Sequence, residues 1–259
     1  KTLIGDQAPP GDLFLQDTHR KIRLALDQAE MLSQRYQVVV ANPPYMGYRQ
    51  MNDSVKTYVE NYFPAGRYDL CTSFLIRQLG ALVAGAFVGM ITPPNWMFIS
   101  SFESLRSNLL LECTIVSMLL NGRGVWGPDF GSASFVLSKA NSGLQRGVFR
   151  RLHDFQGQVQ TNETLQANFL DRDRYPIFHC ATKDFLRIPG APIAFWVSNQ
   201  IRWIFEEYDS IGDLASPRQG MASSDNEWPL GHLPAPSINR RDRYPPLRRE
   251  ALKSGARWF

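Results

Sequence analysis

Apolar positions along the first 152 residues follow two patterns, short continuous runs and stripes that recur every three or four residues. The runs are rich in β-branched residues, as in buried strands of a parallel sheet, and comprise Val38–Ala41, Phe87–Thr92, Thr114–Leu120 and Ala133–Leu137. Each stripe fits one face of an amphipathic helix. Because helices and strands alternate and end in a hairpin, the pattern predicts an α/β fold with parallel strands.

The longest stripe belongs to a helix that Asp17 or Thr18 can cap. This helix leads into the first strand after a short turn. Its apolar face is expected to pack in the core and consists of Ile22, Leu26, Ala29, Leu32 and Tyr36. Three shorter helices are expected after the first strand. The residues expected to start them are Asp53 or Ser54, Leu70, and Ser100, which has Glu103 at the spacing of a capping box.

The periodicity weakens after the fourth strand. Val148–Leu152 is a further expected strand, antiparallel to Ala133–Leu137. Residues 153–188 are polar and mixed, and are interpreted as a linker or insertion. Apolar sequence then restarts, so the chain is expected to divide into segments 1–152, 153–188 and 189–259.

The composition indicates a globular protein of a reducing compartment. With 259 residues, 44% of them apolar, the chain is long enough to bury a sizeable core. The three cysteines (Cys71, Cys113, Cys180) are widely spaced and expected to be reduced core residues, and the four histidines are scattered, so no metal site is expected. The longest apolar run is too short to span a bilayer, and no signal peptide is visible. A cytoplasmic protein without a membrane partner is therefore predicted.

The charge and the two ends of the chain add two expectations. The net charge of +4 permits a nucleic-acid partner without requiring one. The chain begins at Lys1, not at a methionine, and ends on Trp258-Phe259 without a terminal element. We therefore expect the sequence to be an excerpt from a longer protein.

The candidate chemistry follows the first strand, in Asn42-Pro43-Pro44-Tyr45. Open α/β folds bind ligands at the carboxyl ends of their strands. The two prolines stiffen the turn and hold its carbonyls in place, while Asn42 adds an amide oxygen acceptor and Tyr45 a flat ring. Acceptors beside an aromatic face suit a planar group that carries an NH2. The plainer interpretation is a rigid turn with a packed tyrosine.

An Asn-Pro-Pro-Tyr turn after an apolar strand resembles the catalytic motif of amino-group methyltransferases, above all the N6-adenine DNA enzymes. Later blocks resemble the same family in the same order, namely Tyr68-Asp69-Leu70, Gly89–Thr92, Ser101–Arg106 and Phe135–Leu137. The amino-acid sequence of these motifs most resembles PglX-type methyltransferases of bacterial BREX phage-exclusion systems. The resemblance implies the C-terminal half of a Rossmann-like methyltransferase sheet, with parallel strands ending in an antiparallel hairpin, in residues 1–152.

The resemblance also implies a substrate, double-stranded DNA, and a methyl donor, S-adenosylmethionine, without a metal. The target adenine would be flipped out of the helix, and the Asn42 side-chain oxygen and the Pro43 carbonyl would accept its amine hydrogens. Tyr45 would stack on the base. The family supplies a second flat group from the loop before the antiparallel strand, where Trp126 is the first candidate and Phe130 the second.

The part that binds the cofactor is not recognisable in this sequence. Asp69 matches a family position near the cofactor pocket, although a helix cap is the plainer interpretation. No strand is followed by the family's Gly-x-Gly turn, and Gly122-Arg123-Gly124 is not followed by a helix. The cofactor half is therefore expected before Lys1 or, in circularly permuted relatives, beyond Phe259. The excerpt alone is expected to bind S-adenosylmethionine poorly and to be inactive.

Residues 189–259 are expected to begin an α+β target-recognition region. Arg218–Asn226 resembles the family's Gln-Gly-x-x-Thr-Gly-Asp-Asn stretch, with Ser224 where glycine is usual. A basic tail that contains aromatic residues follows. The candidate DNA contacts are Arg218, Gln219, Asn226, Arg240 and Arg241. The alternative is a solvated surface segment rich in proline and arginine.

Two other functions stay open at this point. The same tetrapeptide serves glutamine-amide methyltransferases that act on release factors, but those enzymes end soon after the last strand, whereas this chain continues. The second alternative is a catalytically silent fragment that contacts DNA or a partner subunit. The resemblance favours adenine methylation of DNA in phage defence, with other phage-defence subunits as further partners.

Overall fold

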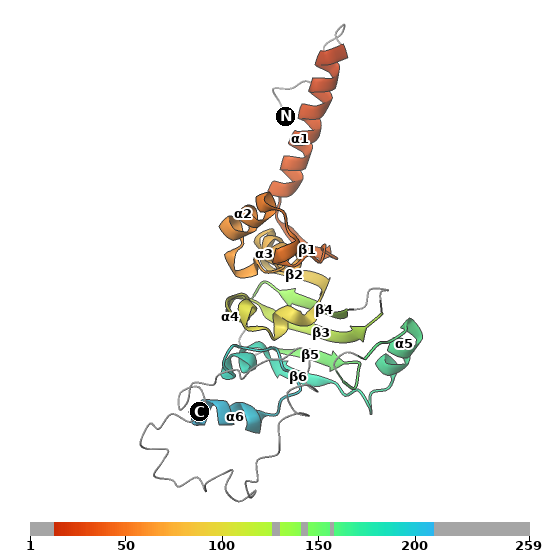
Figure 1. Cartoon of the computed structure of the whole chain (residues 1–259), viewed down its shortest axis with the longest axis vertical. Helices are drawn as coiled ribbons and strands as arrows, with labels where there is room; N and C mark the ends of the chain where they lie inside the picture. The colour runs from red at the N-terminus through yellow and green to blue at the C-terminus, as the bar shows by residue number, and fades with distance from the viewer. Residues whose placement is uncertain (1–12, 126–129, 141–144, 156–157, 210–259) are drawn as a thin grey trace, which may run out of the picture. The chain divides into compact units, whose positions relative to one another are not determined.

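The computed structural model describes residues 13–125, 130–140, 145–155 and 158–209. The chain divides into two compact units, Lys1–Asp209 and Ser210–Phe259, and the second unit lies outside the described residues. The first unit is built on one mixed β-sheet (Figure 1). Its strands are β1 (Tyr36–Ala41), β2 (Leu82–Thr92), β3 (Thr114–Arg123), β4 (Gly131–Ser138), β5 (Arg146–Arg151) and β6 (Phe178–Ala181).

Helices and short 3-10 turns connect these strands. The α-helices are α1 (Leu13–Ser33), α2 (Asp53–Tyr62), α3 (Leu70–Gly80), α4 (Glu103–Glu112), α5 (Asn162–Leu170) and α6 (Asn199–Glu207). The 3-10 turns are η1 (Tyr48–Gln50), η2 (Pro64–Gly66), η3 (Pro94–Met97), η4 (Ser100–Phe102) and η5 (Thr182–Arg187). None of the helices in the described ranges is long and apolar enough to cross a membrane.

The strand order is β1-β2-β4-β3-β5-β6. β1 pairs with β2 in parallel, and β4 lies between β2 and β3 and is antiparallel to both. β5 pairs with β3 in parallel, and β6 is the other edge strand and runs antiparallel to β5. β1, β2, β3 and β5 therefore run in one direction. Their carboxyl ends and the start of β4 share one edge of the sheet, the edge where open α/β folds bind ligands.

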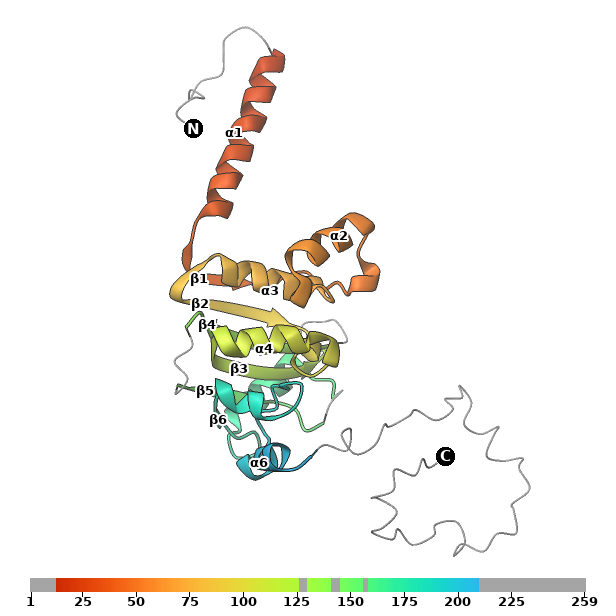
Figure 2. The same cartoon turned by 90° about the vertical axis from the view of Figure 1, so that its left-hand side faces the viewer.

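One face of the sheet is covered by helices. Figure 2 shows α3 and α4 side by side on this face, where α3 contacts β2 and α4 contacts β3. The two helices and the strands bury a common apolar core that includes Leu75, Val88, Leu105, Met118 and Phe135. Cys113 and Cys180 belong to this core, and Cys71 is also buried, so all three cysteines are buried free thiols as predicted.

The opposite face of the sheet is open over β1, β2 and β5. Val38 and Val40 are 61% and 81% exposed, and Phe87 and Val148 are each about 40% exposed. The prediction of a strand buried on both faces is therefore wrong for β1, which is an edge strand with only Val39 and Ala41 turned to the core. The described residues provide no layer over this face.

The apolar stripe of α1 is also exposed. Ile22 is 43% and Leu32 66% exposed, so the prediction that this stripe packs in the core is wrong for the described part of the chain. A helix does form here, because the sequence has helical periodicity and no internal glycine or proline. It begins at Leu13, so the predicted cap at Asp17 or Thr18 is wrong, and Asp17 instead forms ion pairs with Arg20 and Lys21 inside the helix. A 21-residue helix with an uncovered apolar face requires a partner that the described residues do not supply.

The predicted α/β class, with parallel strands and an antiparallel hairpin, is confirmed, but the hairpin forms between β3 and β4 and not between Ala133–Leu137 and Val148–Leu152. Val148–Leu152 does form a strand that runs antiparallel to β4, but it pairs with β3 in parallel and does not touch β4 in the sheet. Residues 153–188, interpreted as a linker or insertion, contain α5 and β6, and β6 joins the sheet.

Two further predicted helix starts are corrected. Asn52, not Asp53 or Ser54, caps α2 by accepting a hydrogen bond from the Val55 amide at 2.9 Å. Ser100 lies in η4, and α4 begins at Glu103 without a side-chain cap, so the predicted capping box is absent. Because η4 directly precedes α4, the turn supplies the helix entry that a capping box would otherwise provide.

Candidate active site

The Asn-Pro-Pro-Tyr turn lies directly after β1, at the edge where the parallel strands end. Asn42 and Pro44 are exposed, Pro43 is buried and Tyr45 is half-buried. The Tyr45 hydroxyl lies 2.5 Å from Asn42 Oδ1 and 3.1 Å from the carbonyl oxygen of Ile91 in β2. The tyrosine thus bridges the ends of two neighbouring strands and orients the Asn42 amide. An amide oxygen has two acceptor positions, so Asn42 Oδ1 keeps one for a ligand.

The backbone after the motif is tied to the start of α3. The Leu70 amide donates to the Met46 carbonyl and the Tyr48 amide to the Tyr68 carbonyl, both at 2.9 Å. Asp69 caps α3 by accepting from the Cys71 amide at 2.9 Å, and its same oxygen lies 3.4 Å from the Met46 amide. Asp69 therefore makes the predicted helix cap and also anchors the turn; its predicted place near a cofactor stays a prediction.

Tyr45 contacts a second aromatic ring. Phe130, 39% exposed, meets Tyr45 edge to face with 5.3 Å between the ring centroids and 83° between the planes. The structure therefore brings Phe130, the second candidate for base stacking, into the motif. Trp126, the first candidate, lies outside the described residues. Partial burial raises the pKa of the Tyr45 hydroxyl, so it stays a neutral donor at physiological pH.

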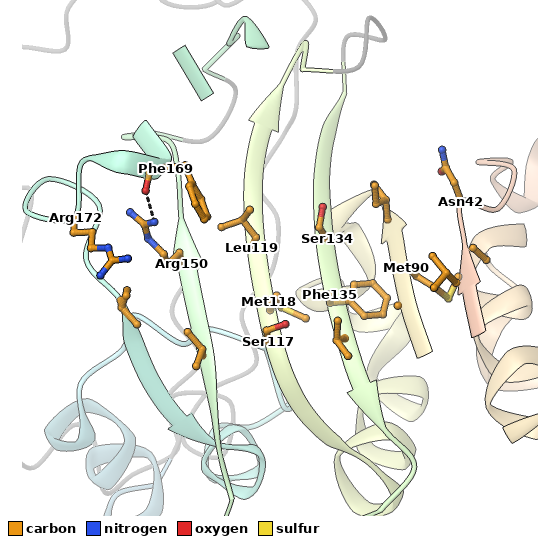
Figure 3. A pocket seen from close by; sticks show the side chains of 17 residues that line it. Asn42, Met90, Ser117, Met118, Leu119, Ser134, Phe135, Arg150, Phe169 and Arg172 are labelled. Atoms are coloured by element: carbon orange, nitrogen blue, oxygen red, sulfur yellow. Dashed lines mark hydrogen bonds between the residues drawn. The ribbon is translucent and has the colours of Figure 1, made fainter. Parts of the chain in front are cut away.

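An apolar trough runs from Asn42 along the open face of the sheet (Figure 3). Its volume is about 530 Å³, and Met118, Leu119, Ser134 and Phe135 line its middle. Arg150 and Arg172 lie at the end away from Asn42. The trough therefore continues the uncovered face of the sheet, and its lining favours apolar side chains over a polar ligand.

Two buried arginines that the sequence did not single out hold the fold around the site. Arg106 in α4 is 1% exposed and donates to the carbonyls of Trp96, Ile99 and Gly190 at 2.6–3.0 Å. Arg150 in β5 donates to the carbonyls of Phe169 and Tyr175 at 2.6–3.1 Å. The only sequence signal for Arg106 is its place at the end of the family block Ser101–Arg106.

Thr92, at the carboxyl end of β2, is fully buried and accepts a hydrogen bond from the Trp96 indole at 2.8 Å. This bond fixes the turn that follows β2, one strand away from Asn42. The predicted DNA contacts Arg218, Gln219, Asn226, Arg240 and Arg241 all lie outside the described residues. Among the described residues, no group of histidine, cysteine, aspartate or glutamate side chains has the arrangement of a metal site.

One protein-family model matches the part of the chain that carries this motif. Residues 12–124 match the family model described as Eco57I restriction-modification methylase. This part of the chain therefore resembles an Eco57I-type restriction-modification methylase, which confirms the resemblance predicted from the Asn-Pro-Pro-Tyr motif.

Two curated relatives are similar over most of the chain. The adenine-specific methyltransferase BrxX of Escherichia coli O9:H4 (strain HS) is 33% identical over 257 residues, which cover 97% of this chain and 20% of that protein. The adenine-specific methyltransferase PglX of Lacticaseibacillus casei (strain Zhang) is 28% identical over 211 residues, which cover 80% and 18%. The chain thus spans about one fifth of the length of these relatives.

A solved structure of a DrdV–DNA complex aligns with 68% of this chain and 20% of its own chain, with 13% identity and a TM-score of 0.47.

Proposed function

We propose that this chain supplies the catalytic part of a site-specific DNA methyltransferase, which transfers a methyl group from S-adenosylmethionine to N6 of a flipped-out adenine. The observation that carries the proposal is the exposed Asn42 amide oxygen, which Tyr45 orients at the carboxyl edge of the sheet within an Eco57I-like domain. The names of the two curated relatives support the same function.

The chain's own residues would act on the amine and not on the methyl donor. Conjugation with the purine ring makes N6 a poor nucleophile. Acceptors at Asn42 Oδ1 and the Pro43 carbonyl would hold the two amine hydrogens and favour a more pyramidal nitrogen. They would also stabilise the positive charge that grows on nitrogen as the methyl group arrives. The stiffness that Pro43 and Pro44 give the turn would keep these acceptors in place without reorganisation.

Aromatic rings would hold the extruded base. Tyr45 is the proposed stacking partner on one side, and Phe130 or Trp126 on the other. Tyr45 would have a second role, because its hydroxyl hydrogen-bonds to Asn42 Oδ1 and thereby fixes the amide orientation. Because Tyr45 has these two roles, substitutions can separate the effect of its ring from the effect of its hydroxyl.

Replacing Tyr45 by phenylalanine is expected to lower the single-turnover methylation rate of the full-length protein about five- to tenfold, the value of one hydrogen bond. The affinity for DNA should stay near the wild-type value because the ring is kept. Tyr45→Ala should in addition raise the fluorescence of 2-aminopurine placed at the target position, since the flipped base, still held from the other side, loses a stacked ring that quenches it. Equal rates for the wild type and Tyr45→Phe would contradict the orienting role.

The residues described do not make a complete site for S-adenosylmethionine. Asp69 is the candidate contact, but its carboxylate already caps α3, and no glycine-rich turn links a strand to a helix beside it. The uncovered edge of β1 and the exposed face with Val38 and Val40 are where a further layer of structure would pack. We therefore propose that the cofactor-binding part lies outside the described residues and packs next to β1.

This arrangement predicts different results for the chain and for the full-length protein. Isothermal titration of the 259-residue chain with S-adenosylmethionine should give no heat of binding, while the full-length protein should bind one equivalent. Circular dichroism of the chain checks that it is folded. Stoichiometric binding by the chain alone would show that its own residues complete the cofactor site.

The function itself is tested by incubating the full-length protein with methyl-labelled S-adenosylmethionine and a DNA library. N6-methyladenine at one recurring sequence is the expected product. A label that appears only on a glutamine of release factors would favour the protein methyltransferase, and no label on either would favour a silent binding fragment. The similarity to BrxX and PglX supports a role in phage defence. We propose in addition that the enzyme is cytoplasmic and works with other defence subunits.

A further inference from the structure

A second pocket lies at the same edge of the sheet as Asn42, and its lining is basic and aromatic. Its volume is about 560 Å³, and its walls come from the carboxyl ends of β3 and β5, the start of β4 and the turn after β2. The cationic and aromatic residues that line it are Arg123, Arg151, His153, Phe98 and Trp196. Among the described residues, no aspartate or glutamate lines this pocket. Such a lining favours an anionic ligand that carries a flat group.

Arg151 lines the pocket, and its guanidinium has hydrogen-bond donors that no described residue occupies. Its guanidinium lies 5.1 Å from the centre of the Trp196 ring, and within the described residues it makes no hydrogen bond or ion pair. Arg150, the residue before it, is different, because backbone carbonyls take up its donors. A guanidinium stacked on an indole keeps its N–H edge for a second partner, and the planar fork matches a phosphate.

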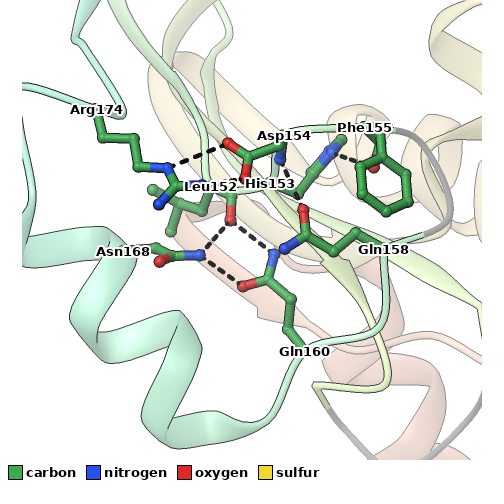
Figure 4. A network of polar contacts seen from close by, with 8 residues as sticks. All are labelled: Leu152, His153, Asp154, Phe155, Gln158, Gln160, Asn168 and Arg174. Atoms are coloured by element: carbon green, nitrogen blue, oxygen red, sulfur yellow. Dashed lines mark hydrogen bonds and ion pairs between the residues drawn. The ribbon is translucent and has the colours of Figure 1, made fainter.

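The wall of the pocket is held rigidly by a buried polar network (Figure 4). The Gln160 amide group donates to the carbonyls of Leu152 and Asn121 at 2.6 and 3.1 Å and accepts from Asn168 at 2.9 Å. Gly122, which lines the pocket, has a φ of +83°, and a Cβ atom there would lie 2.5 Å from Gln160 Nε2. The network thus joins the end of β3 to the segment after β5.

The carboxylate that follows His153 in the sequence is paired with another arginine. Asp154 follows His153 but forms an ion pair with Arg174 at 2.6 Å, as Figure 4 shows. The His153 ring nitrogen Nδ1 lies 3.1 Å from the Phe155 carbonyl, which fixes the orientation of the ring. The side chains on the pocket wall are therefore positioned before any ligand binds.

We infer that this pocket binds a phosphodiester group of the DNA, with Arg151 on the phosphate and the adjoining nucleotide against Trp196. The inference rests on the proposed DNA methyltransferase function and adds a subsite to it. β3 and β5 are three and four strands away from β1, which is roughly 14 to 19 Å at about 4.8 Å per strand. A stacked DNA strand covers that distance in about four to six nucleotides, at about 3.4 Å each.

The test measures DNA affinity of the full-length protein by fluorescence anisotropy over a series of salt concentrations. The probes are duplexes that carry the methylated sequence and a neutral methylphosphonate at one position at a time. Arg151→Gln is expected to raise Kd about five- to tenfold and to lower the salt slope by about one. One methylphosphonate, about four to six nucleotides from the target adenine, should weaken wild-type binding but cause no further loss in Arg151→Gln.

Arg146→Gln is the matched control, because Arg146 is an exposed arginine at the opposite end of the same strand. It should keep the wild-type Kd and salt slope. Arg151→Lys keeps the charge and should restore the slope, which separates the charge from a packing defect if Arg151→Gln lowers the unfolding temperature. A wild-type Kd and slope for Arg151→Gln, or no methylphosphonate position coupled to it, would overturn the inference.

The two proposals fail in different ways. A full-length protein that methylates adenine while Arg151→Gln binds DNA normally overturns the subsite alone. Conversely, DNA binding that depends on Arg151 in a protein that transfers no methyl group overturns the proposed function and supports the subsite. A protein that does not bind DNA at all overturns both.

Discussion

Replacing Asn42 with alanine is expected to lower the single-turnover rate of DNA methylation by the full-length protein about 10²- to 10³-fold. This corresponds to about 3–4 kcal/mol, the usual effect of removing one preorganised hydrogen-bond partner of a developing charge. The loss should appear in the rate and not in DNA affinity, because the charge on the amine grows only as the methyl group arrives. Rapid quench with labelled S-adenosylmethionine measures this rate.

Two further variants define the origin of the loss. Asn42→Asp has nearly the same shape but adds a negative charge, which Tyr45 would then contact. The methylation rate of Asn42→Asp tests whether the shape of this side chain, without the neutral amide, is sufficient for activity. Asn61→Ala is the matched control, since Asn61 is an exposed asparagine in α2, and its rate should equal that of the wild type. An Asn42→Ala enzyme with wild-type turnover would remove Asn42 from the chemistry.

Replacing Arg106 with methionine is expected to destabilise the 259-residue chain by about 3–5 kcal/mol. Arg106 is buried and has no ion-pair partner among the described residues, and its guanidinium satisfies three backbone carbonyls, those of Trp96, Ile99 and Gly190. Burial lowers the pKa of this guanidinium from its usual value. Methionine fills similar volume but leaves the three carbonyls without donors, which is the costly part of the change.

Urea unfolding followed by circular dichroism measures this free energy. Arg49→Met is the matched control, because Arg49 is an exposed arginine of η1, and its effect should stay within about 0.5 kcal/mol. A loss below about 1 kcal/mol in Arg106→Met would mean that water or other donors replace the guanidinium. The result concerns the fold that positions the site, and it is independent of methylation.

The sequence predicted the elements of this fold better than their surroundings. Strands and helices follow from local periodicity, and the Asn42-Pro43-Pro44-Tyr45 turn falls at the strand end where the pattern predicts it. The exposure of Val38 and Val40 was missed because an apolar run has the same appearance at a sheet edge and in its centre. The same holds for the stripe of α1, whose partner is not among the described residues.

Long-range pairings were harder to predict than local ones. Val148–Leu152 was expected beside β4, its neighbour in sequence, yet β5 crosses over to β3. Arg106 was missed as a structural residue because its partners are backbone carbonyls, which every sequence contains and no motif marks. The Tyr45–Asn42 hydrogen bond was also not predicted, since the ring alone suggested stacking.

The most direct test is a structure of the full-length protein with a cofactor analogue and a duplex that carries its target adenine. The account predicts that the flipped adenine places N6 within about 3 Å of both Asn42 Oδ1 and the Pro43 carbonyl oxygen, with Tyr45 against the base. An adenine bound elsewhere, with Asn42 in contact with no base, would contradict it.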